Sequence, residues 1–343
     1  MVPATVPTIC LNMIVKNESK IISRLFDSVI GVVDCYCISD TGSTDGTPKL
    51  IREYFESRGV PGRVLTDTPF RDFGYNRTVA LRAARGMATY LLLLDADMTL
   101  EVDTSFDKVS LTAAYYRLVQ HSNVLSYYNT RLVRGDLEVV CVGATHEYYD
   151  VGTKESSSTM NTLRILDIGD GGCKANKFER DIRLLKATLD THPEDARSHF
   201  YLANTYHDLG RYDEAIELYI RRIALGGWHE EVWYSYYRIG MCHLHSGRFP
   251  DALCRWLEGY AFNPKRAEGL YEAVKYYREH GQHVLAHHFY RLAKAIPYPK
   301  DDMLFLHKAV YTHQLDYELS VFGYYLPEFD KDPAFRREVR AVY

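Results

Sequence analysis

The sequence predicts two domains of different class, an α/β domain over residues 1–175 and an all-α domain of helical repeats over residues 176–343. Up to about residue 100, short apolar runs alternate with helical patterns, which favours right-handed βαβ units and a mostly parallel sheet. Beyond residue 178 the chain reads as helical and repeats itself. With 343 residues, 46% of them hydrophobic, each domain can bury its own core.

Four apolar runs are predicted to be the parallel strands, namely residues 8–15, 35–39, 63–67 and 90–94. The stretches between them carry apolar residues at helical spacing and are predicted to be helices, namely residues 19–32, 45–59 and 75–86. In sheets of this kind, ligands bind beyond the carboxyl ends of the strands. Residues that follow those ends are therefore the candidates for a functional site.

Residues 112–150 change character, because runs rich in β-branched and aromatic residues follow one another at 113–120, 124–133 and 137–143. They predict an antiparallel extension of the sheet. The polar, serine-rich segment 151–161 is expected to be a mobile loop.

The helical half contains an internal repeat in which a glycine is followed five residues later by an alanine. The glycines Gly210, Gly247 and Gly281 are spaced by 37 and 34 residues, and Ala215, Ala252 and Ala286 repeat the same spacings. A helix–turn–helix period of 34 residues with Gly at the turn and Ala at the close contact resembles the tetratricopeptide repeat. The first copy carries a three-residue insertion near residues 226–228. Such repeats present a concave surface on which a protein or peptide can bind.

The overall composition excludes some classes of protein. A net charge of -4 argues against a chain that grips nucleic acid through its phosphates. The N-terminus lacks a secretory signal and no apolar stretch is long enough to span a membrane, so an intracellular, soluble, cytoplasmic protein is expected. Seven scattered cysteines without a CxxC pair suggest neither a disulfide framework nor a cysteine zinc site.

The apolar run YLLLLDADMTL, residues 90–100, stops abruptly at Asp95 and Asp97. Two carboxylates at this spacing can both turn toward a divalent cation such as Mg²⁺ or Mn²⁺, which would neutralise a diphosphate. The alternative is an ordinary helix cap and turn residue. Two further polar segments, residues 13–18 and 39–47, follow the first two strands. The second segment consists mainly of small residues at the start of a helix, which would let a nucleotide approach closely. Its alternative interpretation is an N-capped helix start.

Five motifs, VKNE, DTGSTDGT, FGYNRTVAL, LLLDADM and HE, occur in an order that resembles the family 2 glycosyltransferases with the GT-A fold, a Rossmann-like nucleotide-sugar-binding fold, followed by tetratricopeptide-like repeats. The resemblance covers nearly the whole chain. It implies metal-dependent, inverting transfer of a sugar from a nucleotide-diphosphate sugar to a hydroxyl of a protein, peptide or glycan, with Mn²⁺ or Mg²⁺ as cofactor. A uridine diphosphate (UDP) sugar is the favoured donor, although thymidine and guanosine diphosphates fit the same motifs.

The resemblance also assigns positions in the donor pocket. Asp40 is similar to the carboxylate that contacts the nucleoside, Gly42 and Ser43 belong to the same loop, and Lys16 and Glu18 border the pocket. Asp97 is expected to ligate the metal, while Asp95 faces the ribose or the metal.

The remaining positions concern the transfer step. Glu147 is the expected general base and His146 a third metal ligand or an acceptor contact, the alternative being an exposed His-Glu pair on a strand. Arg77 contacts donor sugar or phosphate, or forms a surface salt bridge. Lys177 and Arg180 fold over the diphosphate as part of a lid, or belong to an interdomain linker.

Two other functions remain open. A non-enzymatic scaffold would retain an inactive transferase domain beside a repeat module. The intact DAD and HE pairs argue against it, because isolated buried charges are costly without a ligand. Nucleotidyl transfer would usually need an early phosphate-gripping Gly-rich loop with a lysine, and VKNE is not one.

Overall fold

A computed structural model describes residues 6–122, 126–152, 154–172 and 177–342. The chain divides into two compact units, Met1–Leu184 and Leu185–Tyr343. The division falls within helix α4 (Lys177–Thr191). The domain boundary expected at residue 175 lies outside the described residues.

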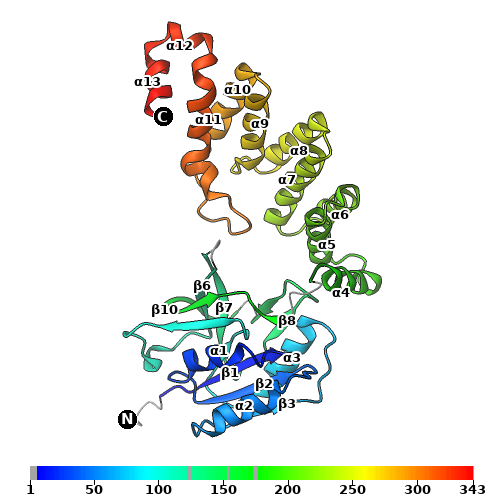
Figure 1. The fold of residues 1–343 in the computed structure, drawn as a ribbon, viewed down its shortest axis with the longest axis vertical. Helices are drawn as coiled ribbons and strands as arrows, with labels where there is room; N and C mark the ends of the chain where they lie inside the picture. Colours follow the sequence, from blue (N-terminus) through cyan, green and yellow to red (C-terminus); the bar gives the residue numbers. More distant parts are fainter. Residues whose placement is uncertain (1–5, 123–125, 153, 173–176, 343) are drawn as a thin grey trace. The chain divides into compact units, whose positions relative to one another are not determined.

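The N-terminal unit is built on a sheet of eight strands in the order β3-β2-β1-β4-β7-β6-β10-β5 (Figure 1). The strands are β1 (Ile9–Val15), β2 (Cys35–Asp40), β3 (Gly62–Leu65), β4 (Tyr90–Leu93), β5 (Met98–Val102), β6 (Tyr115–His121), β7 (Ser126–Arg134) and β10 (Ser157–Asp167). The four strands predicted from apolar runs, β1 to β4, pair in parallel. β7 then pairs antiparallel with both β4 and β6, which confirms the predicted α/β fold with an antiparallel extension.

Helices cover both faces of this sheet, as expected for βαβ units. α1 (Ile22–Val29) and α2 (Thr47–Glu56) bury Phe26 and Phe55 in one apolar core, together with the side chains of β1, β4 and β10 on that face. α3 (Phe73–Ala84) places Leu81 and Ala84 in a second core on the opposite face. The polar motifs lie at and after the carboxyl ends of the parallel strands.

Two predictions for residues 137–161 are corrected by the structure. The run 137–143 yields only the short strand β8 (Val140–Val142), which pairs with β9 (Tyr148–Asp150) in a separate two-stranded sheet. The serine-rich segment 151–161 is not a loop throughout, because β10 begins at Ser157 and pairs in parallel with β6. Its Ser and Thr side chains face solvent while Met160 is buried, so the strand lacks a conspicuous apolar pattern at its start.

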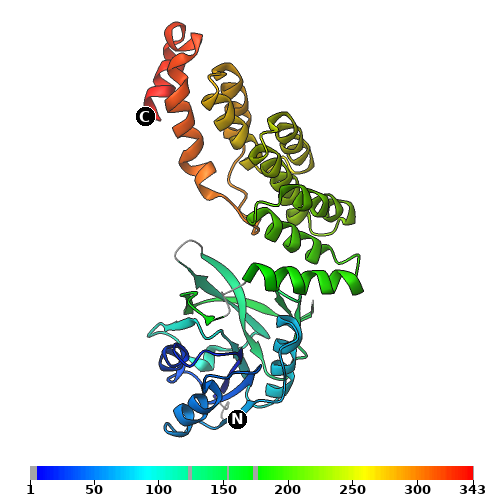
Figure 2. The same ribbon diagram turned by 45° about the vertical axis from the view of Figure 1, so that its right-hand side comes forward.

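The C-terminal unit is helical, with short antiparallel helix pairs stacked side by side (Figure 2). Its helices are α5 (Ala196–Asp208), α6 (Tyr212–Leu225), α7 (His229–His245), α8 (Phe249–Phe262), α9 (Glu268–Glu279), α10 (His283–Lys294), α11 (Leu315–Phe322), α12 (Pro327–Lys331) and α13 (Pro333–Ala341). Short 3₁₀ or π segments occur in this unit at η3 (Val310–Gln314) and η4 (Gly323–Tyr325), and in the N-terminal unit at η1 (Lys108–Ser110).

The repeat pattern has a direct structural cause. The glycines of the repeat, Gly210, Gly247 and Gly281, end the first helix of each pair with φ between 67° and 73°, a conformation that favours glycine. The alanines of the repeat are completely buried where the paired helices touch. The predicted helical repeat architecture is therefore confirmed. None of the helices in the described part of the chain has both the length and the apolar character that a membrane crossing requires.

Candidate active site

The parallel strands bring the polar motifs together at one edge of the sheet. β1 and β2 end side by side, with Val15 opposite Asp40 in the register, and β4 lies on the other side of β1. The segments after these three strands carry Glu18, the loop after Asp40, and the Asp95–Asp97 pair. Since the ends of parallel strands meet at one edge, three sequence motifs contribute to one site.

Asp40 is held in a tight loop and has an unused acceptor. Its carboxylate Oδ2 accepts hydrogen bonds from the backbone N–H groups of Gly42 and Ser43, at 3.2 and 3.0 Å. Gly42 adopts a φ of 108°, which only glycine takes without strain. Asp40 is 3% exposed, and its Oδ1 is buried without a hydrogen-bond partner among the described residues. An unsatisfied buried acceptor is expensive, so this oxygen is suited to receive a donor from a ligand.

The VKNE segment after β1 is tied to the same loop. Asn17, with φ at 57°, donates its N–H to Ser43 Oγ at 2.8 Å and accepts from Thr44 N at 2.7 Å. These bonds leave Lys16 exposed and turn Glu18 inward, where it is 8% exposed. The predicted pocket residues Lys16, Glu18 and Ser43 therefore lie in two bonded segments.

A glycine-rich segment, residues 168–172, closes over the two acids of this edge. Gly171 N lies 3.4 Å from Asp97 Oδ2, and Gly172 N donates to Glu18 at 3.2 Å. A Cβ on Gly171 would lie only 3.0 Å from Asp97 Oδ2, so a larger residue would require the Asp97 carboxylate to shift slightly. Arg24 of α1 holds the segment through two hydrogen bonds to Asp170, at 2.7 and 3.0 Å.

Asp97 and Glu18 form no ion pair with any described residue; the charge of Arg24 acts on Asp97, but Arg24 is paired with Asp170. Burial raises the pKa of Asp97, and the nearby carboxylates of Asp95 and Asp167 raise it further. Burial also raises the pKa of Glu18 despite the N–H of Gly172, and Asp97 adds to that rise. A divalent cation would remove this repulsion, so the two acids suit the metal role predicted for Asp97.

Asp95 is in the opposite situation, because two arginines neutralise it. Arg77 Nη2 donates to Asp95 Oδ1 at 2.6 Å and Arg131 Nη1 lies 3.4 Å from Oδ2. Burial favours the neutral acid, but Arg77 and then Arg131 outweigh it and lower the pKa of Asp95. The charge at the end of the leucine run is thus compensated inside the protein.

Arg77 also binds the predicted base. Its Nε donates to Glu147 Oε1 at 2.7 Å, and the Arg77 side chain is only 10% exposed. The two residues meet because α3 begins against the segment before Glu147, with Gly74 N donating to Gly143 O at 3.1 Å. A Cβ at Gly74 would lie 2.5 Å from Gly143 O. Of the two roles considered for Arg77, the structure shows an ion pair, and it is buried rather than at the surface.

The structure does not bring every predicted residue into one cluster. His146 has a φ of 53° in the turn before β9. Asp95, Asp97 and His146 do not place their ligand atoms within 4.8 Å of one another. Among the described residues, a set of three side chains that meets this criterion lies in the other unit. On α4, Lys177 is exposed, and Arg180 donates to Asp181 at 3.1 Å and lies over the ring of Phe73.

Sequence reasoning missed two buried partners of the site, Arg131 and Gln120. Gln120, 2% exposed, accepts from Arg131 Nη2 at 3.0 Å and donates to Asp167 Oδ2 at 2.9 Å. A chain of contacts therefore runs from Asp95 through Arg131 and Gln120 to the residue that precedes the glycine-rich segment. The signal in the sequence that could have revealed these partners is an arginine and a glutamine within predicted strands whose neighbouring residues are apolar.

Comparison with known protein families agrees with this geometry. Residues 10–113 match the model described as glycosyl transferase family 2, and residues 173–227 match the tetratricopeptide repeat model. The chain combines a family 2 glycosyl transferase region with tetratricopeptide repeats. The first match includes the segments of Glu18, Asp40, Arg77 and Asp97, and it stops before Glu147.

Other similarities concern the repeats. Over 95 residues the chain is 36% identical to the TPR repeat-containing protein Synpcc7942_0270 of Synechococcus elongatus, a match of 27% of this chain and 21% of that protein. The chain thus covers about a fifth of that relative's length. A crystal structure of MamA is 20% identical with a TM-score of 0.36, over 51% of this chain and 90% of MamA. A crystal structure of YrrB, described as a TPR protein with an unusual peptide-binding site, is 14% identical with a TM-score of 0.36, over 49% and 79%.

Proposed function

We propose that the N-terminal unit is a metal-dependent, inverting glycosyltransferase that uses a nucleotide-diphosphate sugar, with a UDP sugar favoured. The acceptor is a hydroxyl of a protein, peptide or glycan. One observation carries this proposal: within the described part of the chain, the buried Asp40 Oδ1 has no hydrogen-bond donor, and at the same strand edge Asp97 and Glu18 have no ion-pair partner. A nucleotide bound with a divalent cation supplies both, because a base offers N–H donors and the cation offers positive charge.

Each part of the donor has a counterpart at this edge. Asp40 Oδ1 accepts an N–H of the base, and the loop at Gly42 and Ser43, whose N–H groups hold Asp40 Oδ2, approaches the nucleoside. Asp97 holds Mn²⁺ or Mg²⁺, with Glu18 beside it. When bound, the ion neutralises the diphosphate and so stabilises it as a leaving group. Asp95, engaged by Arg77 and Arg131, positions the site rather than ligating the ion.

The transfer itself requires a base on the acceptor side. In a single displacement, Glu147 accepts the proton of the acceptor hydroxyl as that oxygen attacks the anomeric carbon. Arg77 orients this carboxylate through its Nε, while Nη2 of the same guanidinium binds Asp95. His146 contacts the acceptor, and Lys177 and Arg180 lie on the helix that follows the glycine-rich segment and act on the diphosphate.

The second candidate is an inactive transferase domain that serves as a scaffold while the repeats bind a protein. A specific observation favours it. Asp95 is satisfied by two arginines, and Glu147 by one of them, so these acids carry no ligand-dependent penalty. Their presence in the sequence is therefore weaker support for catalysis than the unsatisfied groups of Asp40, Glu18 and Asp97.

The two candidates differ in nucleotide binding. The thermal midpoint of the wild type would be measured with UDP, dTDP and GDP, each with and without Mn²⁺, alongside Asp97→Asn. A ligand at 100 times its dissociation constant adds about 2.7 kcal/mol, which gives a clear rise in the midpoint. We expect a metal-dependent rise with one nucleotide that is absent in Asp97→Asn and retained in the control Asp190→Asn, which changes an exposed aspartate on α4. No rise with any nucleotide in the folded wild type would favour the scaffold.

Detection of catalysis would follow from the identified nucleotide. Incubation with its sugar conjugates and Mn²⁺ should release the nucleoside diphosphate by slow hydrolysis, and Glu147→Gln should slow that release. Release at the wild-type rate by Glu147→Gln would remove Glu147 from the role of base.

A further inference from the structure

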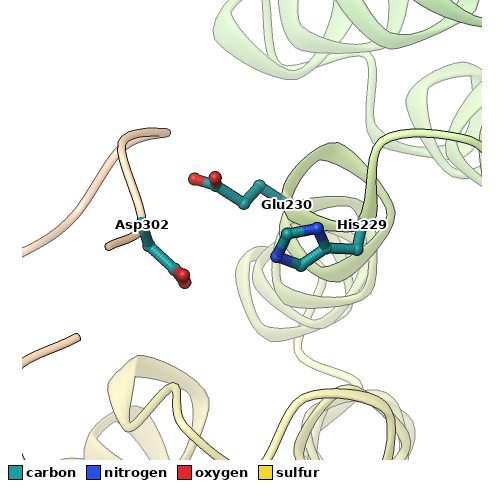
Figure 3. Close-up of side chains that lie close together, drawn as sticks. All are labelled: His229, Glu230 and Asp302. Carbon is teal, nitrogen blue, oxygen red and sulfur yellow. The ribbon is translucent and has the colours of Figure 1, made fainter. Parts of the chain in front are cut away.

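A cluster of metal-ligand side chains lies in the repeat unit, apart from any predicted site residue. His229 and Glu230 are the first two residues of α7, and Asp302 lies in the segment between α10 and η3. One ligand atom from each side chain lies within 4.8 Å of the others. Figure 3 shows the imidazole of His229 and the carboxylates of Glu230 and Asp302 around a common space.

Glu230 is a buried carboxylate that has no ion pair with any described residue. It is 4% exposed, and its Oε2 accepts hydrogen bonds from the N–H groups of Met303 and Leu304, at 2.7 and 2.6 Å. These bonds orient the side chain and fix the segment that carries Asp302. The other oxygen, Oε1, accepts no hydrogen bond from a described residue and retains some contact with solvent, so it is accessible to a ligand. The carboxylate thus has donors on one oxygen only, and no described cation pairs with it.

The next residue in the chain provides a direct comparison. Glu231 is as deeply buried, at 3%, but it receives Arg222 Nε at 3.0 Å and Arg197 Nη1 at 3.2 Å. Two consecutive buried glutamates on α7 thus differ in their partners, since Glu231 has two arginines, whereas Glu230 has two backbone N–H groups and no described arginine.

The arginine nearest to the cluster is committed elsewhere. Arg266 Nη1 lies 3.5 Å from Asp302 Oδ2, the outer limit of a hydrogen bond. Its Nε and Nη2 both donate to Glu268, at 3.1 and 2.9 Å, and both of those side chains are buried. Because Glu268 neutralises Arg266, Glu230 and Asp302 leave an excess of negative charge beside the imidazole.

We propose that His229, Glu230 and Asp302 form a binding site for a divalent transition-metal ion of the Zn²⁺ class. One imidazole nitrogen and two carboxylate oxygens are the ligands that such ions accept, whereas Mg²⁺ and Ca²⁺ prefer oxygen alone. The N-terminal end of α7 disfavours a cation modestly, and the charges of the two carboxylates exceed that effect. The exposed His229 gives the ion a path from solvent.

Such an ion would fasten the segment around Asp302 to the start of α7. Three protein ligands leave coordination positions for water or for a group from a binding partner. The proposed metal site belongs entirely to the repeat unit, and it does not depend on the glycosyltransferase proposal.

Zinc binding by the full chain tests the proposal. The Asp97→Asn chain is used as the background, so that the proposed donor site does not contribute. After treatment with EDTA and gel filtration, the protein is titrated with Zn²⁺ alone by calorimetry, and bound metal is counted after dialysis. We expect one equivalent of Zn²⁺ and a raised thermal midpoint of the repeat unit.

Variants of the two ligands that are easiest to change give the decisive comparison. His229→Gln and Asp302→Asn should each weaken Zn²⁺ binding by at least about 10- to 100-fold. Loss of a residue that only hydrogen-bonds to a metal ligand has an effect of that size, and loss of the ligand itself should cost no less. His288→Gln, which removes an exposed histidine on α10, should bind as the background does. Equal Zn²⁺ binding in His229→Gln and the background, or no binding in the background, would overturn the proposal.

Discussion

Buried charge is treated differently in the two units. In the repeat unit, most buried acids form complete ion pairs, such as Glu268 with Arg266 at 2.9 Å and Glu231 with Arg222 at 3.0 Å. At the strand edge of the N-terminal unit, Asp95 forms ion pairs, but Asp97 and Glu18 form none with the residues that the structure describes, and one oxygen of Asp40 has no hydrogen-bond partner among them. Paired acids support a fold, whereas buried acids left without partners mark the places where a ligand would lower the free energy.

The largest effect is expected where a complete buried pair is broken. Arg266→Met should lower the free energy of unfolding by about 3–5 kcal/mol, because Glu268 remains buried without its cation. All three tryptophans belong to the repeat unit, so tryptophan fluorescence during urea denaturation follows that unit alone. The double variant Arg266→Met with Glu268→Leu should recover much of the loss. A loss below about 1 kcal/mol in the single variant would contradict the assigned role of this pair.

Asp95→Asn applies the same test to the paired acid of the strand edge. The pKa of Asp95 is lowered, so its charged form stabilises the fold above the usual aspartate range and that contribution disappears as pH falls through its folded pKa. The variant should be less stable than the wild type at neutral pH by about 1.5–3 kcal/mol, the size of a charged hydrogen bond. Calorimetry from neutral to acidic pH would show the difference shrinking. A pH-independent difference would assign the effect to packing.

Gly171→Ala probes the approach of the glycine-rich segment to an unpaired acid. The new Cβ would lie 3.0 Å from Asp97 Oδ2, so we expect a loss of about 1 kcal/mol and a weaker response to nucleotide with Mn²⁺. Gly31→Ala is the matched control, since nothing lies within 4 Å of its added Cβ. Equal behaviour of the two variants would show that this segment does not need its close contact.

The smallest effect should have the opposite sign. Asp97 has a raised pKa, so its contribution to stability is present in acid and is lost as pH rises through the folded pKa. Asp97→Asn should therefore be more stable than the metal-free wild type at neutral pH, by up to about 1 kcal/mol, and the two should converge toward pH 4. The same Asp-to-Asn change would then have opposite signs two residues apart. Destabilisation of the metal-free protein at neutral pH would refute the unpaired state of Asp97.

The main elements of the fold were predictable because local patterns determine them. The strands β1, β2 and β4 are apolar runs, and the glycines and alanines of the repeat meet a local need for φ above zero and for close helix contact. The start of β10 was not predicted, because its first residues are exposed serines and threonines, and they hide the alternation of apolar and polar residues that is typical of a strand.

The site was only partly predictable, for reasons of sequence distance. Asp40, Glu18 and Asp97 follow strand ends, so their grouping follows from the parallel topology. The partners of Asp95 do not, since Arg77 and Arg131 lie 18 and 36 residues away and come from a helix and an antiparallel strand. Whether a carboxylate is free or neutralised depends on such contacts, and the sequence motif is the same in both cases.

The order of the strands has a consequence for how the protein can be synthesised and divided. β4 has β7 as its outer neighbour, and β5 pairs with β10, whose last residue is Asp167. A nascent chain that has reached residue 113, where the transferase match ends, therefore exposes the unpaired edges of β4 and β5. Such edges recruit other strands, so fragments cut at the match boundary should aggregate. A fragment that folds must extend at least to Asp167, the end of β10, because β10 is the strand that pairs with β5.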